Sequence, residues 1–411
     1  MRDVITFVMK KVVETSASFG DLDSAFVEFN SKFSAEASKD GFSLSKLQGE
    51  INASLQEWEV EFNLNINPIT PEDIIKNLVS HYVVDRNLNK EIDIKYLGQG
   101  LQRHLIYTLL KLSSNYAEKR VYEKKEFMPE LNLILFEEPE AFLHPGQQES
   151  LNNSLKLLSA SEVQQVIVST HSPFFLSKNI DDIPTLVRLK RELGITRVFQ
   201  VSRETRDKVL VENNELAQLL KSKLGDPLVD EPVKKRIKDI LGDTDDDIRM
   251  EEESIRYLLW LDSERCCAFF ADIVLICEGA TEKALLDYLM KNKWDDLQEK
   301  RVYVLDALGK FNIHRYMNLF KELGVKHSVL ADGDENQGVQ ELINQFIGLQ
   351  RNKYTQSLDF FDNNIEAFLG INAPRRDRPD KKPLNVIWHY TTGKISDDKI
   401  SALKNKVQNL L

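Results

Sequence analysis

The chain has 411 residues, of which 42% are hydrophobic and 29% are charged, a composition typical of a globular protein and not of a disordered one. Its formal net charge of -11 argues against a surface that binds nucleic acid indiscriminately, so any contact with DNA has to be local. No apolar stretch reaches the roughly 18 residues of a membrane span, and the N-terminus lacks the apolar core of a signal peptide. We therefore expect a cytoplasmic protein that makes no use of a membrane.

Four zones follow one another along the chain. Residues 1–58 place apolar and charged positions at helical spacing, which predicts amphipathic helices that form an arm or a dimer face. Residues 59–225 alternate strand and helix patterns, which indicates α/β architecture. A charged stretch with prolines, residues 226–261, is predicted to be a linker. Residues 262–411 contain three β-rich segments separated by helical patterns, as expected of a second, smaller parallel sheet.

Two adjacent glutamates, Glu137 and Glu138, end the apolar run "NLILF". There the first could hold magnesium through water, and the second could orient or deprotonate the water that attacks a γ-phosphate. His171 ends the next apolar run and could contact the same phosphate. Gly98 and Gly100 precede a helix whose N–H groups could meet phosphate presented by a second subunit. Each signal is weak alone, because charged strand ends, structural histidines and glycine turns are common.

Taken in order, these pieces resemble the second half of an ABC-type ATPase head of the OLD (overcoming lysogenization defect) nuclease family. The resemblance implies that "YLGQGLQR" is the signature loop, "LILFEEPEAFLHP" the Walker B strand and "VSTHSP" the switch-histidine loop. Gly98 stands where serine is common, and Glu137 where aspartate is usual. No GxxxxGK[ST] phosphate loop occurs in the sequence. We therefore expect that the chain begins downstream of that loop and turns over little ATP, although ATP would be the nucleotide of the complete head.

The last third of the chain carries a denser set of acids. "DIVLICEGATEK" is an apolar strand that ends at Glu278, with Glu282 in the following helix, and "HSVLADGDEN" is a strand that ends at Asp332 and Asp334. In a parallel sheet both ends meet at the carboxyl edge. Crowded carboxylates raise one another's pKa values unless cations neutralise them, so the pattern predicts Mg²⁺ or Mn²⁺. Two ions about 4 Å apart could hydrolyse a phosphodiester. The alternative is that these acids only cap helices and turns.

These two segments resemble a Toprim domain, with E-G-x-x-E on one strand and D-x-D on a later one, and "FADIVLICEGATEK" is similar to the OLD family's entry to that domain. The resemblance covers roughly residues 262–400. It implies that Glu278 is a metal ligand that can also transfer a proton. The other metal ligands that it implies are Glu282, Asp332 and Asp334.

Further positions follow from the same resemblance. "FFDNNIEAFL" resembles the family's acidic element, which places Glu366 at a metal site; Asn364 stands where aspartate is common, so Asp362 is a possible substitute. Lys394 stands where the family has a lysine that stabilises charge on the scissile phosphate, and a solvated lysine is the alternative. A basic loop between them could grip DNA phosphates or be plain solvated charge. Its cations are Arg375, Arg376, Arg378, Lys381 and Lys382.

The expected fold class is α/β: a partial ABC-type ATPase head with a helical arm, followed by a Toprim domain with a Rossmann-like parallel sheet. By resemblance, the protein would be a metal-dependent DNA endonuclease or nickase coupled to that head. It would act in phage defence like Gabija or retron-associated relatives, as a homo-oligomer, alone or with a second defence-system component. The alternative is a non-cleaving sensor or assembly protein with a structural acidic cluster. Topoisomerase chemistry ranks last, because the C-terminal tail offers no tyrosine domain.

Overall fold

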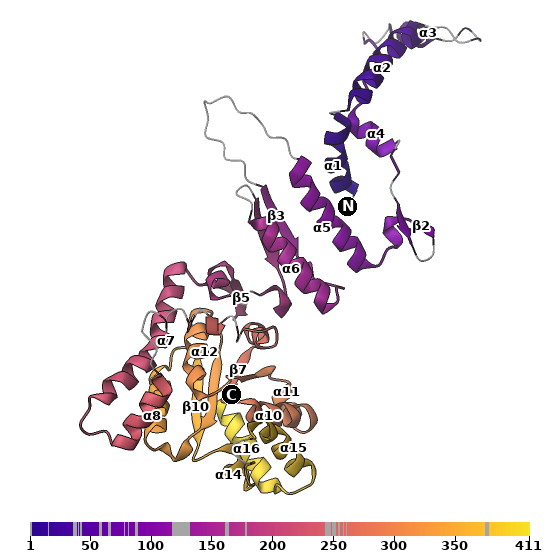
Figure 1. Ribbon diagram of the computed structural model, residues 1–411. Helices are drawn as coiled ribbons and strands as arrows, with labels where there is room; N and C mark the ends of the chain where they lie inside the picture. The colour runs from indigo at the N-terminus through magenta and orange to yellow at the C-terminus, as the bar shows by residue number, and fades with distance from the viewer. Residues whose placement is uncertain are drawn as a thin grey trace. The chain divides into compact units, whose positions relative to one another are not determined.

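The computed structural model divides the chain into two compact units, residues 1–170 and residues 171–411 (Figure 1). No helix in the part of the chain that the structure describes is long and apolar enough to cross a membrane. The described residues are 2–14, 16–35, 39, 41, 43–56, 60–64, 67–77, 79–80, 82–86, 89–116, 132–160, 164–176, 179–242, 248, 252–253, 255–257, 259, 261–374 and 378–411.

The first unit is mainly helical. Its helices are α1 (Arg2–Glu14), α2 (Ala17–Ala35), α3 (Leu44–Leu55), α4 (Pro71–Asn77), the 3-10 helix η2 (Ile94–Tyr96), α5 (Gln99–Tyr116) and α6 (Pro145–Ser159). Its strands β1 (Val83–Asp85) and β2 (Lys90–Ile92) form an antiparallel pair. Strands β3 (Asn132–Glu137) and β4 (Gln164–Ser169) form a parallel pair. The helices expected in the first 58 residues and the two parallel strands expected after them are therefore present.

The second unit is built on a four-stranded parallel sheet with the strand order β10-β9-β7-β8. Its strands are β5 (Val187–Glu192), β6 (Ile195–Gln200), β7 (Ile273–Cys277), β8 (Val302–Asp306), β9 (His327–Asp332) and β10 (Thr355–Phe361). Its α-helices are α7 (Arg203–Leu224), α8 (Glu231–Leu241), α10 (Ala280–Asn292), α11 (Asp295–Gln298), α12 (Ile313–Glu322), α13 (Val339–Leu349), α14 (Ile365–Leu369), α15 (Lys382–Thr391) and α16 (Asp397–Leu410). Its 3-10 helices are η3 (Pro173–Phe175), η4 (Ile180–Thr185), η5 (Arg265–Phe270), η6 (Lys310–Asn312), η7 (Asp334–Asn336) and η8 (Pro379–Lys381).

Alternate residues of the parallel sheet face two different helical layers. In β7, Val274 and Ile276 lie in a core with residues of α7, α8, α12 and α13. Leu275 and Cys277 lie in a second core with residues of α10, α14, α15 and α16. Figure 1 shows α7 and α8 on one side of the sheet and α10, α15 and α16 on the other. A parallel strand covered on both faces needs apolar side chains on both, which explains the continuous apolar runs and confirms the predicted α/β fold.

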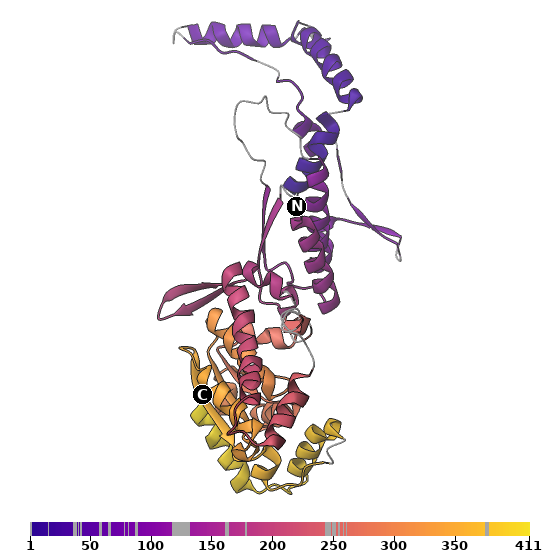
Figure 2. The same cartoon turned by 60° about the vertical axis from the view of Figure 1, so that its left-hand side comes forward.

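The antiparallel strands β5 and β6 form a hairpin that extends from the second unit, drawn in magenta in Figure 2. Arg188 ties its base to the domain, because Nε donates to the carbonyl of Phe269 at 2.8 Å and Nη1 to that of Gly324 at 2.8 Å. Leu193 at its tip is fully exposed. The hairpin is thus anchored at one end and uncovered at the other.

Several apolar residues of the stretch predicted to be a linker belong to the core of the second unit. Ile237 and Leu241 of α8, together with Tyr257 and Leu261, are buried in the core that covers one face of the sheet. Helix α7, which the sequence assigned to the ATPase region, packs against α12. The physical reason is that charged residues on the exposed face of an amphipathic helix dominate the composition, while widely spaced apolar residues make the contacts.

A buried ion pair also joins this stretch to α12. Glu253 and Arg315 are both buried, and Arg315 Nε donates to Glu253 Oε2 at 2.7 Å while Nη2 bonds to the other oxygen. Removing Arg315 leaves the buried Glu253 carboxylate with only a longer contact to Arg256 Nη1, at 3.4 Å. We expect Arg315→Met to lower the free energy of unfolding by about 3–5 kcal/mol, measured by urea denaturation. The control is Lys321→Met on the same helix, which loses a partly exposed pair with Glu212 and should cost less than about 1 kcal/mol. Equal small losses would contradict this account.

Candidate active site

The parallel sheet brings the predicted acids of the second unit to one edge. Glu278 follows β7 directly, and Asp332 is the last residue of the neighbouring strand β9. The backbone N–H of Asp332 donates to Glu278 Oε2 at 3.4 Å. Strand β8 lies on one side of β7 and β9 on the other, so the chain changes direction at β7. Such a switch point, at the carboxyl ends of the strands, is where open α/β sheets bind their ligands.

Two further carboxylates lie buried beside this edge. Glu282 in the first turn of α10 is 4% exposed, and its Oε2 accepts a hydrogen bond from the Gly279 N–H at 3.1 Å. Glu366 in α14 is 1% exposed, and its Oε1 has no hydrogen-bond partner, although Lys382 Nζ lies 3.9 Å away. The charges of both glutamates raise the pKa of Asp332, so the acids act on one another electrostatically.

The loop after β9 holds Asp334 at the same edge. Its backbone lies in the left-handed region with φ of +48°, and its N–H donates to the carbonyl of Asn363 at 2.9 Å. A Cβ at Gly333 would lie 2.1 Å from the carbonyl oxygen of Phe361, so only glycine fits between this loop and the end of β10. The sequence "DGD" therefore has a packing reason for its glycine as well as two acids.

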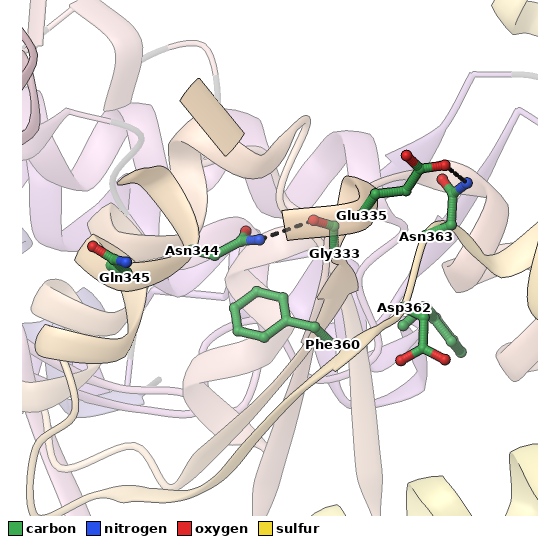
Figure 3. A pocket seen from close by; sticks show the side chains of 8 residues that line it. Gly333, Glu335, Asn344, Gln345, Phe360, Asp362 and Asn363 are labelled. Atoms are coloured by element: carbon green, nitrogen blue, oxygen red, sulfur yellow. Dashed lines mark hydrogen bonds between the residues drawn. The ribbon is translucent and has the colours of Figure 1, made fainter. Parts of the chain in front are cut away.

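An open pocket of about 700 Å³ lies beside this loop (Figure 3). Asn344 of α13 donates to the Gly333 carbonyl at 3.0 Å, and Asn363 donates to Glu335 Oε1 at 3.2 Å. Phe360 of β10 lines the same pocket. The loop that carries Asp334 is thus braced on both sides and open to solvent at the pocket.

Burial and mutual repulsion raise the pKa values of the acids. Burial raises the pKa of Asp332 to about 9, and the charges of Glu282 and Glu278 add to the effect. Burial raises the pKa of Glu282 to about 7, and the charges of Glu278 and Glu366 contribute. Burial also raises the pKa of Glu278, although the ammonium of Lys310 opposes this. The nearby lysine charge therefore does not offset the burial and mutual repulsion of these acids.

Carboxylate oxygens are the ligands that Mg²⁺ and Mn²⁺ prefer, so the chemistry of the donor set suits these ions. Among the described residues, however, no three acidic, histidine or cysteine side chains could hold an ion as they now stand. Lys310 Nζ bonds to Asp334 Oδ2 and lies 4.0 Å from Glu278 Oε2, so an ammonium stands between two of the acids. The buried Oε1 atom of Glu366 accepts no hydrogen bond, so its lone pairs are available to a cation. The donor set thus suits a divalent ion in its chemistry, while the lysine contacts occupy two of its acids.

Two of the described lysines contact the acids, and neither is Lys394, the lysine that the resemblance assigns to the scissile phosphate. They are Lys310, which follows β8, and Lys382 at the start of α15. The exposed Lys394 instead has its Nζ 3.6 Å from the centre of the Trp388 ring. Lys310 lies in "ALGKFN", a Gly-Lys segment that follows the β-rich run "RVYVL". Its position directly after a predicted strand was the signal that could have found Lys310.

The remaining predicted residues have ordinary structural contacts. Asn364 accepts a hydrogen bond from the Ala367 N–H at 2.8 Å and so caps α14, and Asp362 lines the pocket of Figure 3. Arg378 of the basic loop is exposed and pairs with Asp380 at 2.7 Å. The rest of that loop includes residues 375–377, which lie outside the described part of the chain.

In the first unit Glu137 and Glu138 lie at the end of a parallel strand pair. Glu137 of β3 lies opposite Ser169 of β4, and the N–H of Glu138 donates to the Ser169 carbonyl at 2.9 Å. Glu138 has a positive φ of +41°, which marks a sharp turn after the strand. His171 follows β4 by two residues. The acid pair and the segment that leads to His171 thus leave the sheet at the same edge.

The start of α5 packs against the loop that follows β3. A Cβ at Gly100 would lie 3.0 Å from the carbonyl oxygen of Phe142, whereas one at Gly98 would meet open space. Arg103, one turn into α5, donates to the Glu138 carbonyl, a contact that sequence reasoning missed. Gly100 therefore has a packing role, and a contact of these glycines with phosphate from a second subunit stays a prediction.

Comparison with known proteins adds two domain matches. Residues 10–176 match the AAA ATPase domain, and residues 269–334 match the Toprim domain of overcoming lysogenization defect protein-like proteins. The second match includes the four acids at the ends of β7 and β9.

Three curated relatives are similar to most of the chain. Endonuclease GajA of Bacillus cereus (strain HuB5-5) is 26% identical over 300 residues, which are 69% of this chain and 38% of the relative. Old nuclease of Escherichia phage P2 is 24% identical over 296 residues, 71% of this chain and 43% of the relative. OLD nuclease of Thermus scotoductus (strain ATCC 700910 / SA-01) is 24% identical over 304 residues, 69% of this chain and 47% of the relative. The chain thus spans less than half the length of each of these relatives.

Proposed function

We propose that this chain, which joins an AAA ATPase domain to a Toprim domain of the overcoming lysogenization defect type, cuts or nicks DNA with the help of divalent metal ions. The proposal is carried by the convergence of Glu278, Glu282 and Asp332 at one sheet edge, with Asp334 and Glu366 beside them. Crowded acids of this kind are stable when cations share them. The names of the relatives, all nucleases, support the same conclusion.

Each acid has a role in this proposal. Glu278, Glu282, Asp332 and Asp334, with Glu366, would hold two Mg²⁺ or Mn²⁺ ions. Bound ions would supply positive charge that activates a water molecule and stabilises the leaving oxygen. Glu278 would accept the proton of that water, because burial raises its pKa and makes its carboxylate a better base.

A cation is also needed for the substrate phosphate. Lys382 is 43% exposed at its side chain and lies at the cluster, so a phosphate that approaches the acids would meet it. Lys394, to which the resemblance gives this task, would have to leave the Trp388 ring to perform it. With a net charge of -11, contact with DNA would be limited to this local basic region.

In a complete head that binds ATP, the ATPase domain would gate DNA cleavage or act as a sensor. We propose that Glu137, Glu138 and His171 serve the nucleotide there, and that Gly98 and Gly100 face it across a homo-oligomer formed through the head and the helical arm. The 411 residues contain no GxxxxGK[ST] loop, so by themselves they would turn over little ATP. A role in phage defence, alone or with a second component, extends the resemblance to GajA and the OLD nucleases.

The nuclease proposal is tested with supercoiled plasmid. Purified chain is expected to convert it to nicked or linear DNA with Mg²⁺ or Mn²⁺ and not with EDTA. Glu282→Ala should lower the rate at least about 100-fold. The matched control is Asp287→Asn on the same helix, whose exposed carboxylate pairs with Lys283 at 3.1 Å and should leave the rate unchanged. Plasmid that stays intact with both wild type and Glu282→Ala would exclude cleavage and favour the non-cleaving sensor.

A further inference from the structure

Lys310 is a buried lysine in the wall of the acid cluster. It follows β8 in a loop where Gly309, at φ of +109°, donates its N–H to the Glu278 carbonyl at 2.7 Å. The lysine is 3% exposed, although lysines are seldom buried unless their charge is paired. Its loop is therefore built against the strand end that carries the first acid of the site.

The ammonium of Lys310 has three neighbours. It bonds to Asp334 Oδ2, lies 4.0 Å from Glu278 Oε2 and donates to Gln340 Oε1 at 3.3 Å. Two of these partners are acids from different strand ends, and the third is a neutral amide in the first turn of α13. The ammonium thus bridges two carboxylates much as a metal ion would, with an uncharged partner beside it.

This arrangement cannot persist when a divalent ion is shared by the same two acids. An ammonium that donates to Asp334 occupies lone pairs that the ion needs, and two cations repel one another at this distance. Gln340 offers the ammonium a hydrogen bond that does not involve an acid. The site thus contains both a contact that opposes the metal and a partner that remains when that contact is lost.

We propose that Lys310 is a built-in counter-ion that competes with the divalent metal for Glu278 and Asp334, so that metal binding must displace its ammonium group. The inference rests on the proposed metal-dependent nuclease function. In the metal-free state Lys310 holds the acids together. In the metal-bound state its ammonium leaves Asp334, and the exchange raises the metal concentration at which the site fills.

The first test measures Mn²⁺ binding by the full chain, with the free ion counted by electron paramagnetic resonance. Lys310→Met is expected to bind Mn²⁺ about tenfold more tightly than wild type. The same variant should melt at a lower temperature than wild type in EDTA and gain more from added Mn²⁺, since ligand binding stabilises the folded state. Mn²⁺ affinity that is unchanged or weaker in Lys310→Met would overturn the proposal.

Two controls separate displacement from general electrostatics. Lys310→Arg keeps the charge and should bind Mn²⁺ no more tightly than wild type. Lys382→Met removes a lysine that lies 3.9 Å from Glu366 and is 43% exposed at its side chain. Because solvent screens this charge, the affinity of Lys382→Met for Mn²⁺ should differ from that of wild type by less than about threefold. An equal gain in Mn²⁺ affinity in Lys382→Met and Lys310→Met would show that any nearby positive charge has the same effect. That result would overturn the proposed exchange of the Lys310 ammonium for the metal.

The second test uses the unmodified protein and does not depend on a variant that folds. Lysines are acetylated in EDTA or in Mn²⁺ and quantified peptide by peptide by mass spectrometry. Lys310 should be protected without metal and modified several-fold faster with it, while Lys382 changes little. Equal protection of Lys310 in both conditions would refute the displacement.

The outcomes also separate this inference from the proposed function. If wild type binds Mn²⁺, Glu282→Ala does not, and Lys310→Met resembles wild type, only the exchange is wrong. If wild type binds no Mn²⁺ at millimolar concentration, the metal-dependent nuclease and the exchange are both wrong.

Discussion

Asp332→Asn is expected to stabilise the metal-free protein and to abolish DNA cleavage. Asp332 is 8% exposed, and burial with the charges of Glu282 and Glu278 raises its pKa to about 9. An uncharged amide of the same shape has no charge to bury or protonate on folding, and it can keep the hydrogen bond that Oδ1 accepts from the Ile365 N–H at 3.1 Å. The same change removes a metal ligand. Active sites commonly trade stability for function in this way.

The expected effects have opposite signs and are measured separately. In EDTA, the free energy of unfolding of Asp332→Asn from urea denaturation should exceed that of wild type by about 1 kcal/mol. Plasmid cleavage with Mn²⁺ should fall about 1000-fold, comparable to the loss of one key charge-stabilising group in an enzyme. The matched control is Asp359→Asn on the neighbouring strand β10, where the acid pairs with Lys406 at 2.6 Å. It should cost less than about 1 kcal/mol and leave cleavage unchanged. An Asp332→Asn protein that cleaves normally would contradict the proposed site.

The stability of the metal-free protein is expected to fall as pH rises from about 5 to about 9. The pKa of Asp332 rises from its ordinary 3.8 to about 9 on folding, and that of Glu282 from 4.5 to about 7. Between the unfolded and folded values, the folded state keeps protons that the unfolded state has lost, so a rise in pH favours unfolding. Below the unfolded values both states are protonated and this stabilisation is complete.

Bound metal should reverse this dependence. Divalent ions compete with protons for the same oxygens, so their contribution to stability grows with pH. Urea denaturation at about five pH values, in EDTA and in Mg²⁺, measures both trends. Asp332→Asn and Glu282→Gln should each flatten the curve in EDTA, and Asp287→Asn should not. A wild-type curve in EDTA that is level between these pH values would show that the acids do not repel one another as the structure implies.

The acid motifs of the second unit could be predicted because their signals are local. Each apolar run of β7 and β9 ends at the residue where its strand ends, and the acids follow directly. In a parallel sheet, strand ends with the same direction meet at one edge whatever the strand order. The Toprim resemblance of these segments matches the domain found for residues 269–334.

The contacts around these acids could not be predicted from local signals in the sequence. Lys310 reaches the cluster from the far side of β7, because β8 and β9 flank that strand, and strand order depends on the whole domain. Lys382 rather than Lys394 lies at the acids, although both are near the ends of α15. A helix of ten residues separates its ends by about 15 Å, so which end meets the site is decided by packing.

The extent of the second unit likewise depends on tertiary contacts. The charges of residues 226–261 suggested a linker, yet Ile237, Tyr257 and Leu261 are buried in its core, and Glu253 pairs with Arg315. By itself, the sequence determined the α/β class, the strand ends and the acids at those ends, since periodicity and burial are properties of short segments. Only the tertiary structure decided which cations neutralise the acids and which helices cover the sheet, because these contacts join residues far apart in the chain.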